Sequence, residues 1–122
     1  LVIEVQTDAG WQPVGNTSLM EFDWPSACAE VGIFIGEKQL WGRRIGQRAL
    51  GLVLDYAFFD LNLNRVSLRV YAPNTHAIRC YEAVGFQHEG RMRQAMNRKG
   101  ELVDILLMSV LRAEWPRRAA HS

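Results

Sequence analysis

The chain has 122 residues, of which 48% are apolar and 22% charged, and its formal net charge at pH 7 is +1. This length suits one domain with one core, and the composition excludes general disorder. The balance of 14 basic and 13 acidic residues gives no sign of a nucleic-acid-binding protein. We expect a single domain over residues 1–115 and a flexible tail over 116–122.

Strand-like runs and turns alternate in the N-terminal third. Strands are predicted over 1–5, 11–22 and 28–35, with polar turns between them. Gly32, inside the third run, suggests a bulge or a close approach of another group to the backbone. Because the chain starts at Leu1 without a methionine, we expect a segment to be missing upstream.

A helical period follows these strands. Apolar side chains recur every three or four positions from residue 43 to about 61, which predicts a helix with an apolar stripe on the core. The stripe consists of Ile45, Ala49, Leu52, Val53, Tyr56 and Phe59.

The C-terminal half predicts a strand, a short helix and a hairpin. Residues 65–72 alternate with period two, and Pro73-Asn74 ends that strand. Thr75 is predicted to cap a helix that runs to Val84 and stops at Gly85. Strands over 86–96 and 102–111 are joined by a turn at 97–100. This order predicts an α/β (α+β) fold, with helices packed on the faces of a mixed sheet.

The segment between the third strand and the long helix has the composition of a phosphate-binding turn. A helix N-terminus offers unpaired N–H groups and a partial positive charge, and both favour a phosphate. Gly42 and Gly46 would let the backbone approach a ligand closely, and Arg43 and Arg44 add positive charge. Taken alone, this pattern is more often an ordinary turn before a solvated helix face. Its glycine spacing is neither that of a dinucleotide fingerprint nor that of a P-loop.

A second constellation is more specific, and it comprises Asn74, Ala77, Tyr81, Gly85 and Phe86. In this order and at this separation, the two constellations resemble the GNAT family of N-acetyltransferases. The resemblance covers about residues 30–115. Within the family, the chain looks similar to the branch of ribosomal-protein N-terminal and spermidine acetyltransferases.

The resemblance implies a mostly antiparallel sheet in which the strand at 29–35 splays from the strand at 65–72. It also implies acetyl-CoA as co-substrate, with the pantetheine arm in the gap and the pyrophosphate on the turn at 41–46. Tyr81 matches the usual general acid near the coenzyme sulphur. The coenzyme-binding positions are Ile33, Phe34, Ile35, Trp41, Gly42, Arg43, Arg44, Ile45, Gly46, Asn74, Ala77 and Arg79.

The attacking amine must lose a proton, and Glu30 is our candidate for the base that accepts it. The alternative is that Glu30 is an exposed charge on a strand. Arg44 stands where the family usually has glycine, so it either crowds the pyrophosphate or pairs with it. The family's first strand and two helices precede the region that matches Leu1. We expect a truncated chain, a naturally short product or a protomer completed by a partner, and in each case an open acceptor side.

The sequence therefore favours an N-acetyltransferase acting on a primary amine of a peptide N-terminus, a polyamine or a small molecule. The alternative is a non-catalytic module that binds acetyl-CoA or a partner on the same fold. A polyamine pocket would need Glu21, Asp23 and Glu30 to converge. An RNA contact ranks last, through a basic cluster of Arg91 and Arg93 on one strand face with Arg98 and Lys99 in the turn.

The remaining expectations concern partners and environment. The three histidines, His76, His88 and His121, do not form a ligand set, so no metal is predicted. Cys28 and Cys80 lack metal-ligand spacing, which favours free thiols in a reducing cytoplasm. No apolar run reaches the length of a membrane span, so no membrane partner is expected. A shortened domain would leave apolar surface uncovered, which favours a homodimer.

Overall fold

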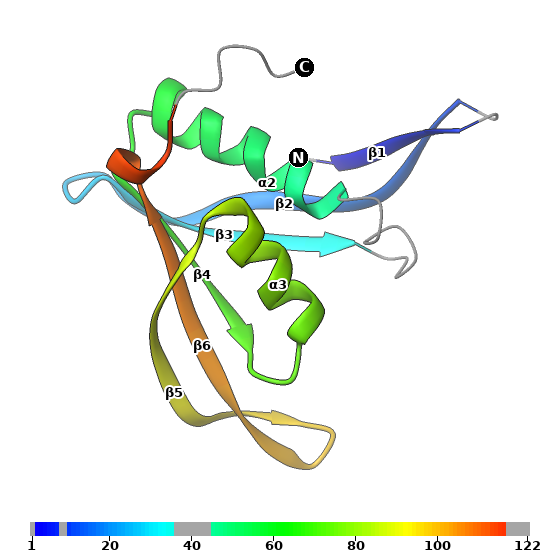
Figure 1. Cartoon of the computed structure of the whole chain (residues 1–122), viewed down its shortest axis with the longest axis vertical. Helices are drawn as coiled ribbons and strands as arrows, with labels where there is room; N and C mark the ends of the chain where they lie inside the picture. The colour runs from blue at the N-terminus through cyan, green and yellow to red at the C-terminus, as the bar shows by residue number, and fades with distance from the viewer. Residues whose placement is uncertain (1, 8–9, 36–44, 117–122) are drawn as a thin grey trace.

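The computed structural model describes residues 2–7, 10–35 and 45–116, and Figure 1 shows the arrangement of their elements. The elements in chain order are β1 (Val2–Thr7), β2 (Gly10–Asp23), β3 (Cys28–Ile35), α2 (Ile45–Asp55), a π-helical turn (Tyr56–Asp60), β4 (Arg65–Tyr71), α3 (Thr75–Val84), β5 (Gln87–Arg98), β6 (Glu101–Leu111) and a 3₁₀ turn (Arg112–Glu114). The predicted succession of strands and helices is therefore confirmed, with boundaries shifted by one or two residues where they can be compared.

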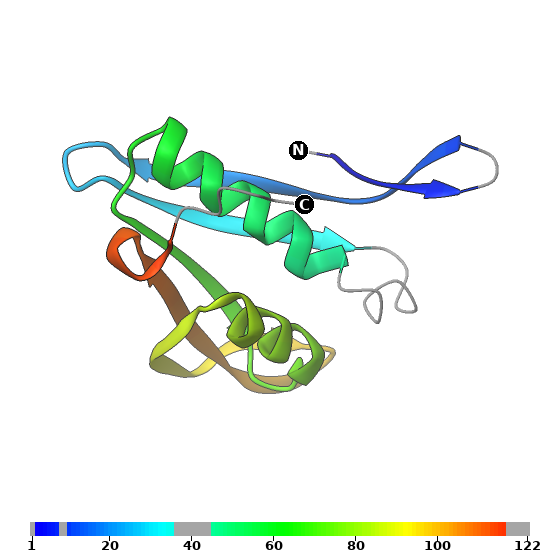
Figure 2. The same ribbon diagram turned by 45° about the horizontal axis from the view of Figure 1, so that its top comes forward.

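The strands form a six-stranded sheet with the order β1-β2-β3-β4-β6-β5. Neighbours pair antiparallel except β3 and β4, which are parallel. The connections β3–α2–β4 and β4–α3–β5 move across the sheet in the same direction, and a right-handed crossover then puts both helices on the same face. Figures 1 and 2 show α2 and α3 together on one side. The mixed, mostly antiparallel sheet predicted from the sequence is confirmed.

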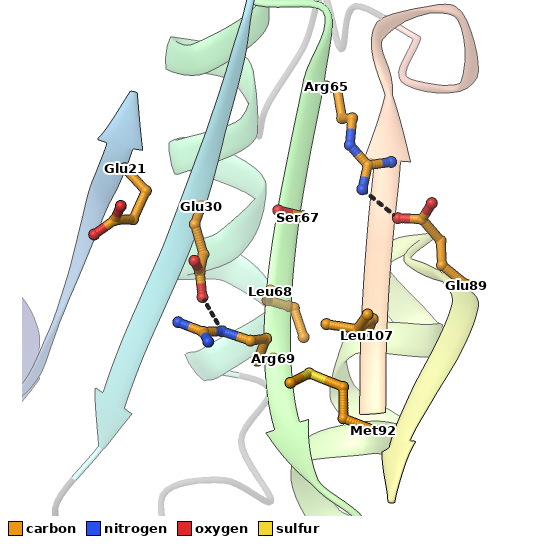
Figure 3. Close-up of a pocket in the computed structure, with 9 residues that line it drawn as sticks. All are labelled: Glu21, Glu30, Arg65, Ser67, Leu68, Arg69, Glu89, Met92 and Leu107. Carbon is orange, nitrogen blue, oxygen red and sulfur yellow. Dashed lines mark hydrogen bonds and ion pairs between the residues drawn. The ribbon is translucent and has the colours of Figure 1, made fainter. Parts of the chain in front are cut away.

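Alternation along β4 separates the two faces of the sheet. One set of side chains is buried beneath the helices and the alternate set is not: Val66, Leu68 and Val70 belong to the first, and Arg65, Ser67 and Arg69 to the second. The helix-covered face carries the core, because Met108 and Val110 of β6 and Ala29 and Val31 of β3 join the same cluster. The opposite face is free of any helix of the described residues, and the polar set of β4 lies there (Figure 3).

The predicted long helix is confirmed, and its predicted apolar stripe meets the core in part: Val53 is buried and Phe59 packs partly buried against the core, as predicted. Leu52 and Tyr56, which the sequence pattern places on the core, are 62% and 46% exposed. Leu50, Leu54 and Phe58 are fully buried instead, at spacings of four residues. The run from 49 to 59 is apolar nearly all round, so its period fits more than one rotation about the helix axis, and contacts with the sheet select between them.

The N-cap of α3 is Asn74, so the prediction of Thr75 is wrong by one residue. The Ala77 N–H donates to Asn74 Oδ1 at 3.3 Å. Both residue types are good caps, and the sequence alone does not choose between adjacent ones. Gly85 ends the helix as predicted, with a φ of 124° that suits glycine.

The β5–β6 hairpin turns on two residues, Lys99 and Gly100, with φ values of 52° and 84°. Positive φ at both positions is what a type I′ turn requires. The Gly100 N–H donates to Asn97 Oδ1 at 3.0 Å. The turn predicted over residues 97–100 is therefore confirmed in place, but it consists of only two residues. Arg98 lies in β5 rather than in the turn, with its guanidinium 4.4 Å from the ring centroid of Tyr71.

Gly32 does not carry a bulge, because it pairs in regular register with Ser18. The irregularity lies in the neighbouring strand, between Met20 and Asp23 of β2. Glu21 in this segment has a φ of 52°, as the extra residue of a bulge often does. A bulge changes the direction of the side chain it contains, and Glu21 lines the pocket described below.

Candidate active site

The parallel strands β3 and β4 separate after a short ladder. Cys28, Ala29 and Glu30 pair with Arg65, Val66 and Ser67, and the described ladder between these strands ends there. Beyond that point β3 stays paired with β2 as far as Ile35, and β4 stays paired with β6 as far as Tyr71. The splayed strand pair expected from the sequence is thus confirmed. The opening lies at the carboxyl ends of two parallel strands, where α/β sheets commonly bind ligands.

A pocket of about 520 Å³ lies on the sheet face that the described helices leave free (Figure 3). Its walls come from β2, β3, β4, β5 and β6, and its lining residues are Glu21, Glu30, Arg65, Ser67, Leu68, Arg69, Glu89, Met92 and Leu107. Three carboxylates and two guanidinium groups therefore line one open pocket.

Glu30 and Arg69 form an ion pair across the opening between the strands. Arg69 Nε donates to Glu30 Oε1 at 2.9 Å. The Arg69 side chain is 56% exposed and the Glu30 side chain 20%. Glu30 is the last residue of the β3 ladder with β4, and Arg69 comes two residues after its partner Ser67. The second carboxylate oxygen of Glu30 has no hydrogen-bond partner among the described residues. That oxygen is free to accept a proton from a ligand.

A second ion pair closes the other side of the pocket. Arg65 Nη2 lies 2.5 Å from Glu89 Oε1. The hydrogen bond from Arg65 holds the pKa of the Glu89 carboxyl below its usual value, and a hydrogen bond with Ser109 acts in the same direction. Glu89 is therefore an anion at neutral pH and is already paired within the protein.

A neighbouring pocket of about 420 Å³ contains the predicted general acid. Tyr81 and Asn74 line it together with Arg69, Val70, Tyr71, Met92, Ala95, Met96 and Ile105. Arg69 and Met92 line both pockets, so they lie between Glu30 on one side and Tyr81 on the other. The structure thus brings the two predicted catalytic residues to adjoining pockets that share one arginine.

Tyr81 is held by packing. It is only 7% exposed, and its ring meets that of Phe86 edge-on at 5.9 Å. Burial raises the pKa of Tyr81 to about 12, so its hydroxyl keeps its proton at neutral pH. The Tyr81 hydroxyl makes no hydrogen bond with another described residue. Every fully buried polar side-chain atom of the described residues has a hydrogen-bond partner, so the unbonded Tyr81 hydroxyl is not fully buried. The hydroxyl is therefore the part of Tyr81 that reaches the pocket.

The other predicted coenzyme positions differ in how the structure places them. Ile33, Phe34 and Ile35 lie in β3 beyond its ladder with β4, where the strands have separated. Ile45 and Gly46 are the first two residues of α2. The predicted positions Trp41, Gly42, Arg43 and Arg44 lie outside the described residues.

Two further predicted positions are on α3. Ala77 is 3% exposed, and its N–H donates to Asn74 Oδ1. Neither its side chain nor its N–H is therefore accessible to a ligand in this structure. Arg79 lies on the exposed side of the helix. Asn74 uses its side-chain oxygen in the cap, which leaves its amide NH₂ as the group available to the pocket.

The carboxylates that a polyamine pocket would need converge only in part. Glu21 and Glu30 line the same pocket, but Asp23 does not. Asp23 Oδ1 instead accepts a hydrogen bond from the Ser26 N–H at 3.2 Å, within the β2–β3 turn. Sequence reasoning also overlooked Arg69. The period-two alternation of 65–71 places it on the polar face beside Glu30, and that signal was available.

The family model described as "Acetyltransferase (GNAT) domain" matches residues 1–87. The chain belongs to the GNAT acetyltransferase family. The GNAT fold is seen again in a solved point mutant of the Vibrio cholerae spermidine N-acetyltransferase, which superimposes with a TM-score of 0.82 at 26% identity. That match covers 96% of this chain and 68% of the other.

Similar sequences carry related names. An uncharacterized N-acetyltransferase of Bacillus licheniformis is 32% identical over 93% of this chain and 62% of its own length. The spermidine N(1)-acetyltransferase of Vibrio cholerae is 29% identical over 94% of this chain and 66% of its own length. A putative ribosomal N-acetyltransferase of Bacillus subtilis is 33% identical, over 83% of this chain and 55% of its own length. The GNAT chain described here thus spans between 55% and 66% of these relatives.

The described residues contain neither a membrane-spanning helix nor a metal-binding cluster. No helix among them is both long and apolar enough to cross a membrane. No group of three or more His, Cys, Asp or Glu side chains in the same part of the chain is arranged to hold a metal ion.

Proposed function

We propose that this GNAT chain transfers the acetyl group of acetyl-CoA to a primary amine by direct attack. The observation that carries the proposal is the opening between β3 and β4, with Glu30 on one side and the Tyr81 hydroxyl on the other. Family membership and the N-acetyltransferase names of its relatives support the same activity.

In the proposed reaction the pantetheine arm lies in the opening, along the separated backbone of Ile33, Phe34 and Ile35. The amine nitrogen attacks the thioester carbonyl, and the C–S bond breaks. Glu30 accepts the proton lost by the amine, through its free carboxylate oxygen. Tyr81 donates its proton to the departing thiolate, which its raised pKa permits because the hydroxyl is still protonated at neutral pH. The pyrophosphate would bind the segment before α2, at Trp41, Gly42, Arg43 and Arg44.

The first test is a calorimetric titration of the chain with acetyl-CoA, with free adenosine as the control. Binding that needs the pantetheine and the phosphates would support the coenzyme site. An acceptor screen that follows thiol release from acetyl-CoA then tests transfer. Binding without transfer to any amine would favour the alternative of a non-catalytic module, and no binding would reject both.

We also propose that the chain forms a homodimer. β5 is an edge strand whose twelve residues are all exposed, and an exposed edge can pair with another chain. Met92 and Met96 on it are 41% and 40% exposed. Light scattering should give twice the monomer mass at high protein concentration, with a fall toward the monomer mass on dilution. A monomer at all concentrations would refute this proposal.

We propose the cytoplasm as the site of action. Both Cys28 and Cys80 are free thiols, as expected in a reducing compartment. Fractionation of cells that express the protein would test the location.

A further inference from the structure

Arg69 has unused hydrogen-bonding capacity at the centre of the candidate site. An arginine carries five N–H donors in a planar fork, and its terminal nitrogens suit a carboxylate. In this structure Nε is bonded to Glu30, and the two terminal nitrogens have no acceptor among the described residues. The Arg69 side chain is 56% exposed and lines both pockets. A ligand that lies between Glu30 and Tyr81 must therefore pass these donors.

The charges around Arg69 do not favour a purely cationic acceptor. Of the three carboxylates in the first pocket, Glu30 is paired with Arg69 and Glu89 with Arg65. Glu21 is the carboxylate of that pocket without an ion-pair partner among the described residues. A polyamine carries several positive charges and would need several unpaired carboxylates, whereas here it would meet two guanidinium groups.

We propose that the acceptor is a zwitterionic amine, with a carboxylate bound by the terminal nitrogens of Arg69 and an amine placed beside Glu30. This inference rests on the proposed acetyltransferase activity and specifies its substrate class. Because Arg69 Nε is 2.9 Å from Glu30, an amine and a carboxylate on one small molecule can reach the two groups together. Met92 and Leu107 offer an apolar wall for the carbon chain between them. Arg69 would thus determine specificity by pairing with the acceptor.

The test compares matched acceptors in the thiol-release assay. The acceptors are ω-amino acids with increasing separation of amine and carboxylate, amino alcohols of the same length, and spermidine. For wild type, kcat/KM for the best amino acid should exceed that for its amino alcohol by about ten- to a hundredfold, as expected for hydrogen bonds between charged groups. In Arg69→Gln this ratio should fall to about one. Arg69→Gln also removes the ion-pair partner of Glu30, but that change affects the amino acid and the amino alcohol equally. It therefore cancels in the ratio of their kcat/KM values.

Two control variants separate recognition from a structural role. Arg69→Lys keeps the charge but loses the fork, and should retain only part of the preference. Arg93→Gln removes an exposed arginine that lines neither pocket, and should keep the wild-type ratio. A wild-type preference for amino alcohols or spermidine, or a ratio unchanged in Arg69→Gln, would overturn the inference while leaving the acetyltransferase proposal intact. Acetyl-CoA binding without transfer to any acceptor would overturn both.

Discussion

Tyr81→Phe removes one hydroxyl and should separate catalysis from coenzyme binding. A general acid contributes about 10²- to 10⁴-fold to rate, which corresponds to roughly 3 to 5 kcal/mol of transition-state stabilisation. Because the ring of Tyr81 and its edge contact with Phe86 persist in the variant, the fold and the pocket wall should persist too. We expect kcat to fall by a factor in this range, measured by thiol release, with acetyl-CoA affinity within about twofold by calorimetry.

The same substitution should change the alkaline stability in a defined direction. Burial raises the pKa of Tyr81 from 10.0 to about 12, so the stability it contributes is full below pH 10 and is lost as pH rises towards 12. At pH 11 this loss amounts to roughly 1.4 kcal/mol of the free energy of unfolding, on the scale of one pKa unit. Tyr81→Phe cannot ionise, so urea unfolding at pH 7 and pH 11 should show that much less alkaline destabilisation than wild type.

Two results would refute this reasoning about Tyr81. Unchanged turnover in the variant would remove Tyr81 from the acid role, whatever its position in the pocket. Equal alkaline destabilisation of both proteins would mean that the side chain ionises freely and is not buried as the structure has it.

Two further predictions concern the fold. Leu54→Ala should lower the free energy of unfolding by about 2 to 5 kcal/mol, because Leu54 is fully buried. Leu52 is 62% exposed, so Leu52→Ala should change this free energy by less than about 1 kcal/mol. Urea titrations measure both, and equal losses would mean that the buried side of α2 is assigned wrongly. Asn74→Ala should cost about 1 kcal/mol through loss of the α3 cap, and Asn74→Ser should recover most of it, whereas a loss that Ser does not recover would indicate another role.

The sequence predicted the order of elements because each carried its own local signal. The period-two alternation of residues 65–71 and the glycines at 85 and 100 depend on neighbours in sequence, and β4, the end of α3 and the β5–β6 turn all formed there. The rotation of α2 could not be predicted in this way. Its run of apolar residues fits several rotations, and contacts with α3, β2 and β3 select the one that buries Leu54 and exposes Leu52.

The sequence predicted individual residues of the candidate site but not which of them interact. Tyr81 follows from the family resemblance and Glu30 from the need for a base beside the splayed strand, and the structure places them in adjoining pockets. The partner of Glu30 is 39 residues away in sequence, and the pairing depends on the register between β3 and β4. Likewise, the convergence of Glu21 with Glu30 depends on a bulge in β2 that no local signal announced, since Glu21 is not a glycine. The register between strands distant in sequence and the position of the β2 bulge therefore could not be predicted from the sequence.

The end of the β3–β4 ladder accounts for the position of the Arg69 and Glu30 pair. Directly opposite residues in a ladder share short contacts, and Glu30 lies opposite Ser67. Arg69 is the next residue of β4 on the same face, so it reaches Glu30 diagonally at the level where the strands have begun to separate. A short side chain at 69 could not span that distance, and one residue earlier or later in β4 would face the core. Ladder length and strand parity thus place Arg69 where its side chain contacts Glu30 at the start of the opening.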